Sequence, residues 1–360
     1  MQKTAAANEI PNWVKLSIAA AGIYGSYLNY GLYQDQVMKY RTTLTPAATK
    51  SGLKPESFNH VWFLNFLEAL VSAVVAALGY FIFKSNKVQD LPHKFLAAAS
   101  FTQTMAKFGM NMSLVHGVSY AVSTLAKSAK AAPVMIAMLV AGKTYEAVQY
   151  LSVKDIILGT ILVSWKSGGD SKGHGHGGGG KSQSMLGVAF IMLSLVCDGL
   201  TGYTQGLSKN AMKDKKLTEQ PHENMFFTNL YMAIIGCSLS LFYGQFFEGI
   251  AFCQANPLVL EKIAYFCICS AVGQIFIFYT ITNFDSLTST TITTTRKIFT
   301  VLLAIWTDYK NNPMDVVNWI GLGNAVIGIS FEVLEKVGGH GKKAEQKPKS
   351  ENPEDSKKEK

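Results

Sequence analysis

Charged residues are scarce in this sequence, at 16% of the 360 residues, whereas hydrophobic residues make up 48%. Long uncharged runs alternate with short Lys-rich segments, which argues against an ordinary soluble domain and indicates a polytopic membrane protein. The formal net charge of +9 does not indicate nucleic-acid binding, because much of the lysine lies between the apolar runs and in the C-terminal tail. That placement is typical of the positive-inside rule of membrane proteins.

The sequence also lacks a catalytic constellation. No HExxH or CxxC pattern occurs, and the GxSxG and Walker A spacings at 169–173 and 175–182 fall in a Gly-rich linker rather than between a strand and a helix, so we expect neither an enzyme nor a resident cofactor or metal. The five cysteines have no disulfide or zinc spacing, and we expect free, buried thiols. No small-residue cleavage pattern follows the first apolar run, so no cleavable signal peptide is expected.

Ten segments are apolar enough to be expected as membrane-spanning helices. An even number of spans places both termini on one side of the membrane. Lys-rich segments between the second and third spans, between the sixth and seventh spans and in the tail then assign that side to the cytosol, although basic residues in the first loop break the rule. We expect the spans at residues 13–33, 58–83, 93–116, 118–141, 151–165, 184–207, 222–247, 257–283, 286–303 and 315–333.

The two halves of the chain are expected to be related. A shift of 166 residues places Lys130 on Arg296, and a shift of 171 places Gly31-x-x-Gln34 on Gly202-x-x-Gln205. Five spans per half would insert the halves in opposite orientations, as in secondary transporters whose site lies between two repeats. The expected organisation is an all-α membrane protein with a cytosolic N-terminus (1–12), a first five-helix repeat (13–165), a Gly/His-rich linker (166–183), a second five-helix repeat (184–336) and a disordered Lys-rich cytosolic tail (337–360).

Two of the expected spans carry cations. The fourth contains Lys127 and Lys130, and the ninth contains the adjacent Arg296 and Lys297 in a Ser/Thr-rich run. Each cation at the bilayer centre costs roughly 2.5–3.5 kcal/mol on insertion scales. A chain keeps such groups inside a bundle when an anion meets them there, and both Lys and Arg suit phosphate. These four cations are therefore predicted to bind a phosphate-bearing substrate.

Acidic residues support a competing interpretation of the same cations. Asp198, Asp35 or Asp285 could pair with them as internal salt bridges, so that no ligand is needed. Asp198 is then either a partner for a cation or a ligand group. Asp35, with Gln34, is either a solvated loop acid or part of a group that gates or positions the substrate. Tyr30 is either a stacking platform for a substrate ring or an interfacial anchor.

The sequence resembles the nucleotide-sugar transporters of solute carrier family 35, subfamily B. This resemblance implies the drug/metabolite-transporter fold, ten helices in two inverted repeats, exchange of a nucleotide-linked solute, and substrate contact at the four cations. It also adds Gln274 to the candidate substrate-binding residues. The likeness covers most of the chain and rests on Tyr30-Gly-x-x-Gln-Asp35, Lys127-Ser-Ala-Lys-x-x-Pro-Val-Met135, Asp198-Gly-Leu-Thr-Gly202, Ala271-Val-Gly-Gln274, ITTTRKIFTVL at 292–302 and Trp319-Ile-Gly.

The expected function is antiport of a nucleotide sugar, UDP-galactose or UDP-glucose, into the lumen of the endoplasmic reticulum or Golgi in exchange for UMP. ATP/ADP exchange across the endoplasmic-reticulum membrane is the alternative within the same class. A membrane scaffold without transport would require every cation to be salt-bridged. A lipid-linked sugar transferase would require paired acidic residues on a loop, and the sequence offers no such pair.

The last four residues, Lys357-Lys358-Glu359-Lys360, match the cytosolic dilysine retrieval signal that coat machinery reads as an address. We therefore expect a multi-pass protein of the endoplasmic-reticulum membrane. Replacing Lys357 and Lys358 by Ser should shift a tagged protein forward to the Golgi in fluorescence images. A variant that stays reticular would show that the tail does not set the location.

Overall fold

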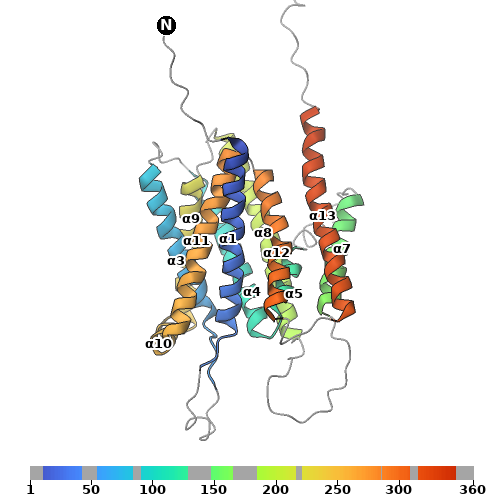
Figure 1. The fold of residues 1–360 in the computed structure, drawn as a ribbon. Helices are drawn as coiled ribbons and strands as arrows, with labels where there is room; N and C mark the ends of the chain where they lie inside the picture. Colours follow the sequence, from blue (N-terminus) through green and yellow to red (C-terminus); the bar gives the residue numbers. More distant parts are fainter. Residues whose placement is uncertain are drawn as a thin grey trace, which may run out of the picture.

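The computed structural model describes residues 11–42, 55–83, 91–128, 147–164, 185–215, 221–284, 286–308 and 315–345. These ranges form a bundle of α-helices, with one isolated β-bridge between Arg41 and Ser57 (Figure 1). The first half contributes α1 (Asn12–Met38), α3 (Val61–Phe83), α4 (His93–Val115), α5 (Tyr120–Ser128) and α7 (Ala147–Ser164). The second half contributes α8 (Met185–Asp214), α9 (Pro221–Phe242), α10 (Gln245–Ala255), α11 (Pro257–Asn283), α12 (Ser286–Asp308) and α13 (Val316–Glu345).

Each expected span overlaps one of these helices, the fourth only over the nine described residues of α5. By length and composition, α3, α8, α9, α11 and α13 are candidate membrane spans. The long helix α12 falls outside this group because Ser, Thr and two cations lower its hydropathy. Low hydropathy is expected of a helix that faces a polar interior rather than lipid. The total of ten spans therefore stays a prediction.

Several expected boundaries differ from the structure. The first, sixth and ninth spans were expected to end at residues 33, 207 and 303, but the helices continue to Met38, Asp214 and Asp308. The seventh span was expected to reach residue 247, but α9 ends at Phe242 because Gly244 adopts a positive φ of 72°, which favours glycine and ends the helix. The tail was expected to be disordered from residue 337, yet α13 continues to Glu345. Residues 342–345 are good helix formers, and extending an existing helix needs no new nucleus. The linker 166–183 lies outside the described residues.

Helices from the two halves pack against each other in pairs. The most extensive contacts join α1 to α11, α4 to α8, α3 to α9 and α7 to α13, and α5 packs on α12. Exchanging the halves in chain order converts the α1–α11 pair into the α8–α4 pair and leaves the other three pairs unchanged. A two-fold relation between the halves would produce this pattern. The pairing therefore supports the inverted repeat, which remains a prediction.

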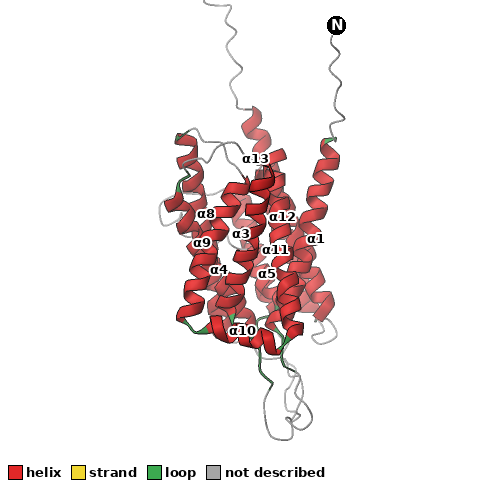
Figure 2. Ribbon diagram, turned by 90° about the vertical axis from the view of Figure 1, so that its left-hand side faces the viewer, coloured by secondary structure: helices red, strands yellow, loops and turns green. Residues whose placement is uncertain are grey.

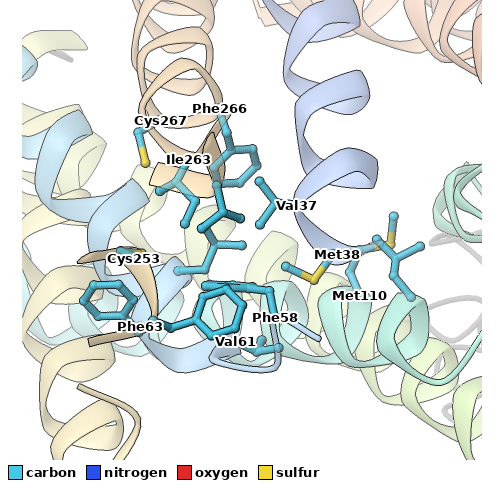
Figure 3. Packing of buried hydrophobic residues seen from close by; sticks show 14 of the residues in the cluster. Val37, Met38, Phe58, Val61, Phe63, Met110, Cys253, Ile263, Phe266 and Cys267 are labelled. Atoms are coloured by element: carbon cyan, nitrogen blue, oxygen red, sulfur yellow. The ribbon is translucent and has the colours of Figure 1, made fainter. Parts of the chain in front are cut away.

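The largest hydrophobic cluster lies at one end of the bundle. The first residues of α1 and the last residues of α13 lie at the opposite end from α10 (Figures 1 and 2). Figure 3 shows how the cluster joins the last turn of α1, the beginnings of α3 and α11, the end of α4, and α10. We call this the α10 end. Its buried members include Val37, Met38, Phe58, Val61, Phe63, Met110, Phe252, Ile263 and Phe266.

Glycines allow α7 and α13 to approach closely. A β-carbon on Gly159 would lie 2.6 Å from the Ala325 backbone nitrogen, and one on Gly321 would lie 2.6 Å from Leu162 Cβ. Small residues of this kind drive helix packing within membranes, where water no longer drives association. The two helices are therefore held by backbone contact rather than by large interlocking side chains.

Gly321→Ala should destabilise the protein by about 1–3 kcal/mol, because the added methyl group overpacks this crossing. Gly323→Ala on the same helix is the matched control, since nothing lies within 4 Å of a β-carbon there. Thermal unfolding of the purified proteins in detergent gives the comparison. Equal midpoints for the two variants would contradict a close crossing at Gly321.

Candidate functional site

The fourth and ninth expected spans share an apolar cluster, and their cations lie next to it in the sequence. Leu125 on α5 and Val301 on α12 belong to this cluster, together with residues of α13. The two helices pack on each other and run in opposite directions. Lys127 follows Leu125, and Arg296 precedes Val301, so both cations lie on the side of the cluster away from the α10 end. The structure thus brings together the two helices whose cations were predicted to bind one phosphate-bearing substrate.

Arg296 lies inside the bundle against α1. Its guanidinium carbon is 4.8 Å from the centre of the Tyr27 ring, and Nη1 donates to Thr300 Oγ1 at 3.3 Å. The Nε atom is buried, and no described residue provides it with a hydrogen-bond partner. Among the described residues, the ion pairs involve other cations, and none includes Arg296. Its positive charge is therefore met by a ring face and a hydroxyl, not by a carboxylate.

Tyrosines of α1 line the neighbourhood of Arg296, and the sequence analysis did not single out two of them. The Tyr24 hydroxyl donates to Thr295 Oγ1 at 2.9 Å, and its ring lies 5.4 Å from that of Phe299. Tyr24 and Tyr27 are three residues apart and therefore share a helix face. This three-residue spacing is the feature of the sequence that could have identified the two tyrosines as neighbours on one helix face. A ring face near a desolvated guanidinium contributes about 2 kcal/mol but does not neutralise the charge.

Lys127 has an acidic partner. Its Nζ lies 3.6 Å from Asp198 Oδ2 on α8, and the two side chains are 26% and 23% exposed. This distance exceeds the 2.7–3.2 Å of a good hydrogen bond, so the contact is a loose ion pair. The salt-bridge interpretation thus describes Lys127 in this structure but not Arg296. Lys297 is partly buried beside Arg296, whereas Lys130, Asp285, Lys357 and Lys358 lie outside the described residues.

Gln34 and Asp35 have polar partners other than the four candidate cations. Gln34 is 4% exposed and donates through Nε2 to Asn111 Oδ1 at 2.7 Å. Asp35 Oδ2 lies 2.8 Å from Lys39 Nζ, one helical turn further along α1. Asp35 also lines a cavity of about 10 Å³ between α1, α5 and α12. That volume holds about one water molecule, far less than a ligand pocket.

Tyr30 and Gln274 also contribute to helix packing. Tyr30 stacks on Phe266 of α11 with ring centroids 4.6 Å apart. Gln274 Oε1 accepts a hydrogen bond from Asn229 Nδ2 at 2.8 Å, and Gln274 Nε2 donates to Ser72 Oγ at 3.4 Å. The predicted site residues therefore do not form one constellation. Arg296 and Lys127 face α1 and α8, whereas Gln34, Tyr30 and Gln274 join neighbouring helices.

Residues 15–336 match the model of the UAA transporter family. The chain belongs to the UAA transporter family. It is 30% identical over 324 residues to solute carrier family 35 member B1 of Xenopus tropicalis, covering 88% of this chain and 93% of that protein. It is 29% identical over 335 residues to UDP-galactose/UDP-glucose transporter 3 of Arabidopsis thaliana (89% and 92%). The identity to UDP-galactose transporter homolog 1 of Aspergillus fumigatus is 26% over 359 residues (91% and 86%).

This member of the UAA transporter family contains a buried ion pair that the sequence analysis missed. Glu68 on α3 is 1% exposed, and its Oε1 lies 2.8 Å from Lys107 Nζ on α4. The Ser270 hydroxyl of α11 donates to the same oxygen at 2.6 Å. The sequence did contain a signal for this pair, because Glu68 lies within the apolar run of α3. A charged side chain in a membrane span is costly and is therefore expected to have a partner. The pair keeps this part of the bundle electrically neutral.

Breaking the Glu68–Lys107 pair on one side should be strongly destabilising, because it leaves an uncompensated buried charge. Glu68→Leu or Lys107→Met alone should cost about 3–5 kcal/mol, whereas the double variant should recover most of that loss. Thermal unfolding of the wild type and the three variants forms the double-mutant cycle. Additive losses would show that the two charges do not compensate each other.

Proposed function

We propose that this chain is a nucleotide-sugar antiporter that moves UDP-galactose or UDP-glucose into the lumen of the endoplasmic reticulum or Golgi in exchange for UMP. Its membership of a transporter family supports the transport part of the proposal. The names of relatives that match most of the chain, a UDP-galactose/UDP-glucose transporter and a UDP-galactose transporter homolog, support the class of substrate.

The observation that carries the proposal is the unpaired charge of Arg296 among the described residues. Its guanidinium is held by Tyr27 and Thr300, and its Nε has no partner. A diphosphate offers two or more negative charges and oxygens at the spacing of the guanidinium fork. In an interior of low dielectric constant such contacts are strong. A phosphate-bearing substrate would therefore supply the anion that the protein does not.

Lys127 would be the second side chain that binds the substrate phosphates. Asp198 would pair with Lys127 while no substrate is bound. The 3.6 Å pair is loose, and a phosphate oxygen could replace the carboxylate without leaving the lysine uncompensated. UMP keeps one phosphate and the same nucleoside after the sugar is used. It would therefore engage the same cations on the return step, as an exchange mechanism requires.

Arg296→Ala should abolish measurable exchange at micromolar substrate in liposomes. Losing one partner of a buried charge contact costs about 2–5 kcal/mol, which is roughly 30-fold or more in affinity. Arg296→Lys should recover little, because the bidentate fork is lost. The matched control is Lys154→Ala, whose side chain is 64% exposed on α7; it should exchange like the wild type.

Thermal shifts with UDP-galactose, UDP-glucose, UMP, ATP and ADP identify the substrate in the same proteins. Greater stabilisation by ATP and ADP than by the uridine compounds would replace the proposal with ATP/ADP exchange. A folded Arg296→Ala protein that is stabilised by UDP sugars as strongly as the wild type would end the role of Arg296 as a phosphate ligand.

Asp198→Asn separates the two interpretations of the Lys127 pair. If Asp198 only occupies Lys127 between substrates, the variant should fold and bind UDP sugars at least as tightly as the wild type. A purely structural salt bridge predicts reduced folded protein and an unchanged affinity in what folds. Yield and thermal shifts with UDP-galactose distinguish these results.

A further inference from the structure

The motif Gly-x-x-Gln occurs once in each half, and its two copies have different surroundings. At the first copy, a β-carbon on Gly31 would lie 2.5 Å from the Tyr120 hydroxyl oxygen, and Gln34 is 4% exposed. At the second copy, nothing lies within 4 Å of a β-carbon on Gly202, and Gln205 is exposed. The first copy is thus packed against its neighbours, and the second is open.

The first copy belongs to a chain of amide hydrogen bonds across three helices. Gln34 on α1 donates to Asn111 on α4 at 2.7 Å, and Asn111 donates through Nδ2 to Asn65 on α3 at 2.9 Å. Asn65 and Asn111 are only 2% and 1% exposed. We call these three residues the Gln34 bridge. Each lies near the α10 end of its helix, beside the hydrophobic cluster of Figure 3.

The second half of the chain contains a matching amide pair, further inside the bundle. Asn65 lies in the run Phe-Leu-Asn-Phe-Leu of α3, and Asn229 lies in the similar run Phe-Thr-Asn-Leu-Tyr of α9. Asn229 donates to Gln274 of α11 at 2.8 Å. In the exchange of halves described above, α4 corresponds to α11, so the Asn65–Asn111 bond corresponds to the Asn229–Gln274 bond. The third member of this set would be Gln205 of α8, which has no side-chain hydrogen bond to another described residue.

We propose that Gln34 and Gln205 are positioning residues that close opposite ends of the transport path in alternation. In the state described, the Gln34 bridge closes the α10 end while Gln205 is released. In the opposite state, Gln205 would join Asn229 and Gln274, and Gln34 would leave Asn111. The inference rests on the proposed antiport, because exchange requires both states. It also reassigns Gln34 from substrate contact to closure of one end.

The chemistry of the amide group suits a reversible closure. A neutral amide hydrogen bond contributes little net free energy, yet a buried amide left without a partner is costly. The amide hydrogen bonds therefore hold the helices at each end together only while those helices pack closely. The free-energy difference between the two states is then small enough for substrate binding to reverse it. Arg296 and Lys127 lie away from the α10 end, on the side where the second motif is open.

Gln34→Leu and its matched control Gln205→Leu test the proposal in lipid nanodiscs. Hydrogen–deuterium exchange in the absence of substrate should rise about two-fold or more over residues 31–38 and 108–118 in Gln34→Leu, because the α10 end opens more often. Gln205→Leu should leave exchange at the α10 end unchanged or lower. In liposomes, both variants should reduce the maximal exchange rate more than they change KM for UDP-galactose, because neither residue touches the substrate.

Glycine variants provide a second test that leaves the amides intact. Gly31→Ala would force the buried Tyr120 to move and should also raise deuterium uptake at the α10 end. Gly202→Ala fits the described state and should not raise it. If Gln34→Leu misfolds, the Gly31→Ala and Gly202→Ala pair decides the question alone.

Two results would overturn the proposal. The first is unchanged deuterium uptake at the α10 end in both Gln34→Leu and Gly31→Ala. The second is a loss of UDP-galactose binding in Gln34→Leu with unchanged uptake, which would return Gln34 to the substrate site. Failure of the proposed function appears differently: the wild type would show no thermal shift with any nucleotide, while the uptake differences between variants would remain.

Discussion

The positive charge of Arg296 in the interior of the bundle is the constraint on which the candidate site depends. An unpaired cation in a low-dielectric interior is expensive, and the described residues provide no carboxylate for it. Only the Tyr27 ring and the Thr300 hydroxyl interact with the guanidinium among the described residues. The α1–α12 interface therefore stabilises the charge only in part, and the proposed phosphate contact rests on this observation.

The other buried charges contrast with Arg296. Glu68 and Lys107 neutralise each other at 2.8 Å, and Lys127 is matched by Asp198 at a looser 3.6 Å. These three environments run from a close buried pair, through a looser pair, to a cation that has no carboxylate partner among the described residues. The proposed function assigns the substrate phosphates to the two less compensated cations, because these gain most from an anion.

The halves of the chain pair in a symmetric pattern but differ in packing. The large cluster, the Gln34 bridge and the Gly31–Tyr120 contact all lie at the α10 end. At the other end, the corresponding Gly202 and Gln205 are open. Both amide pairs are formed in this structure, so the two halves differ in the surroundings of the glutamine rather than in the pair itself, and the proposed alternation rests on this difference.

Local sequence patterns were enough to predict the all-helical membrane class, the approximate ranges of most helices and the two spans that carry cations. These features depend on local hydropathy and on the cost of a charge in lipid, which act within a single segment. Transporter family membership agrees with that interpretation. The break at Gly244 and the continuation of α13 to Glu345 were missed, because helix ends depend on a few dihedral angles and on elongation from a stable helix.

Which polar groups meet could not be predicted without the packing of the helices. The pairing of Lys127 with Asp198, the packing of Arg296 on Tyr27 and the bonding of Gln34 to Asn111 depend on how helices distant in sequence face each other. The Glu68–Lys107 pair had a local signal, yet its neutrality became visible only when α3 lay beside α4. The free-energy cost of burying a charge or an amide can be estimated from the residue type alone. Which group compensates that cost depends on the register and rotation of the neighbouring helices.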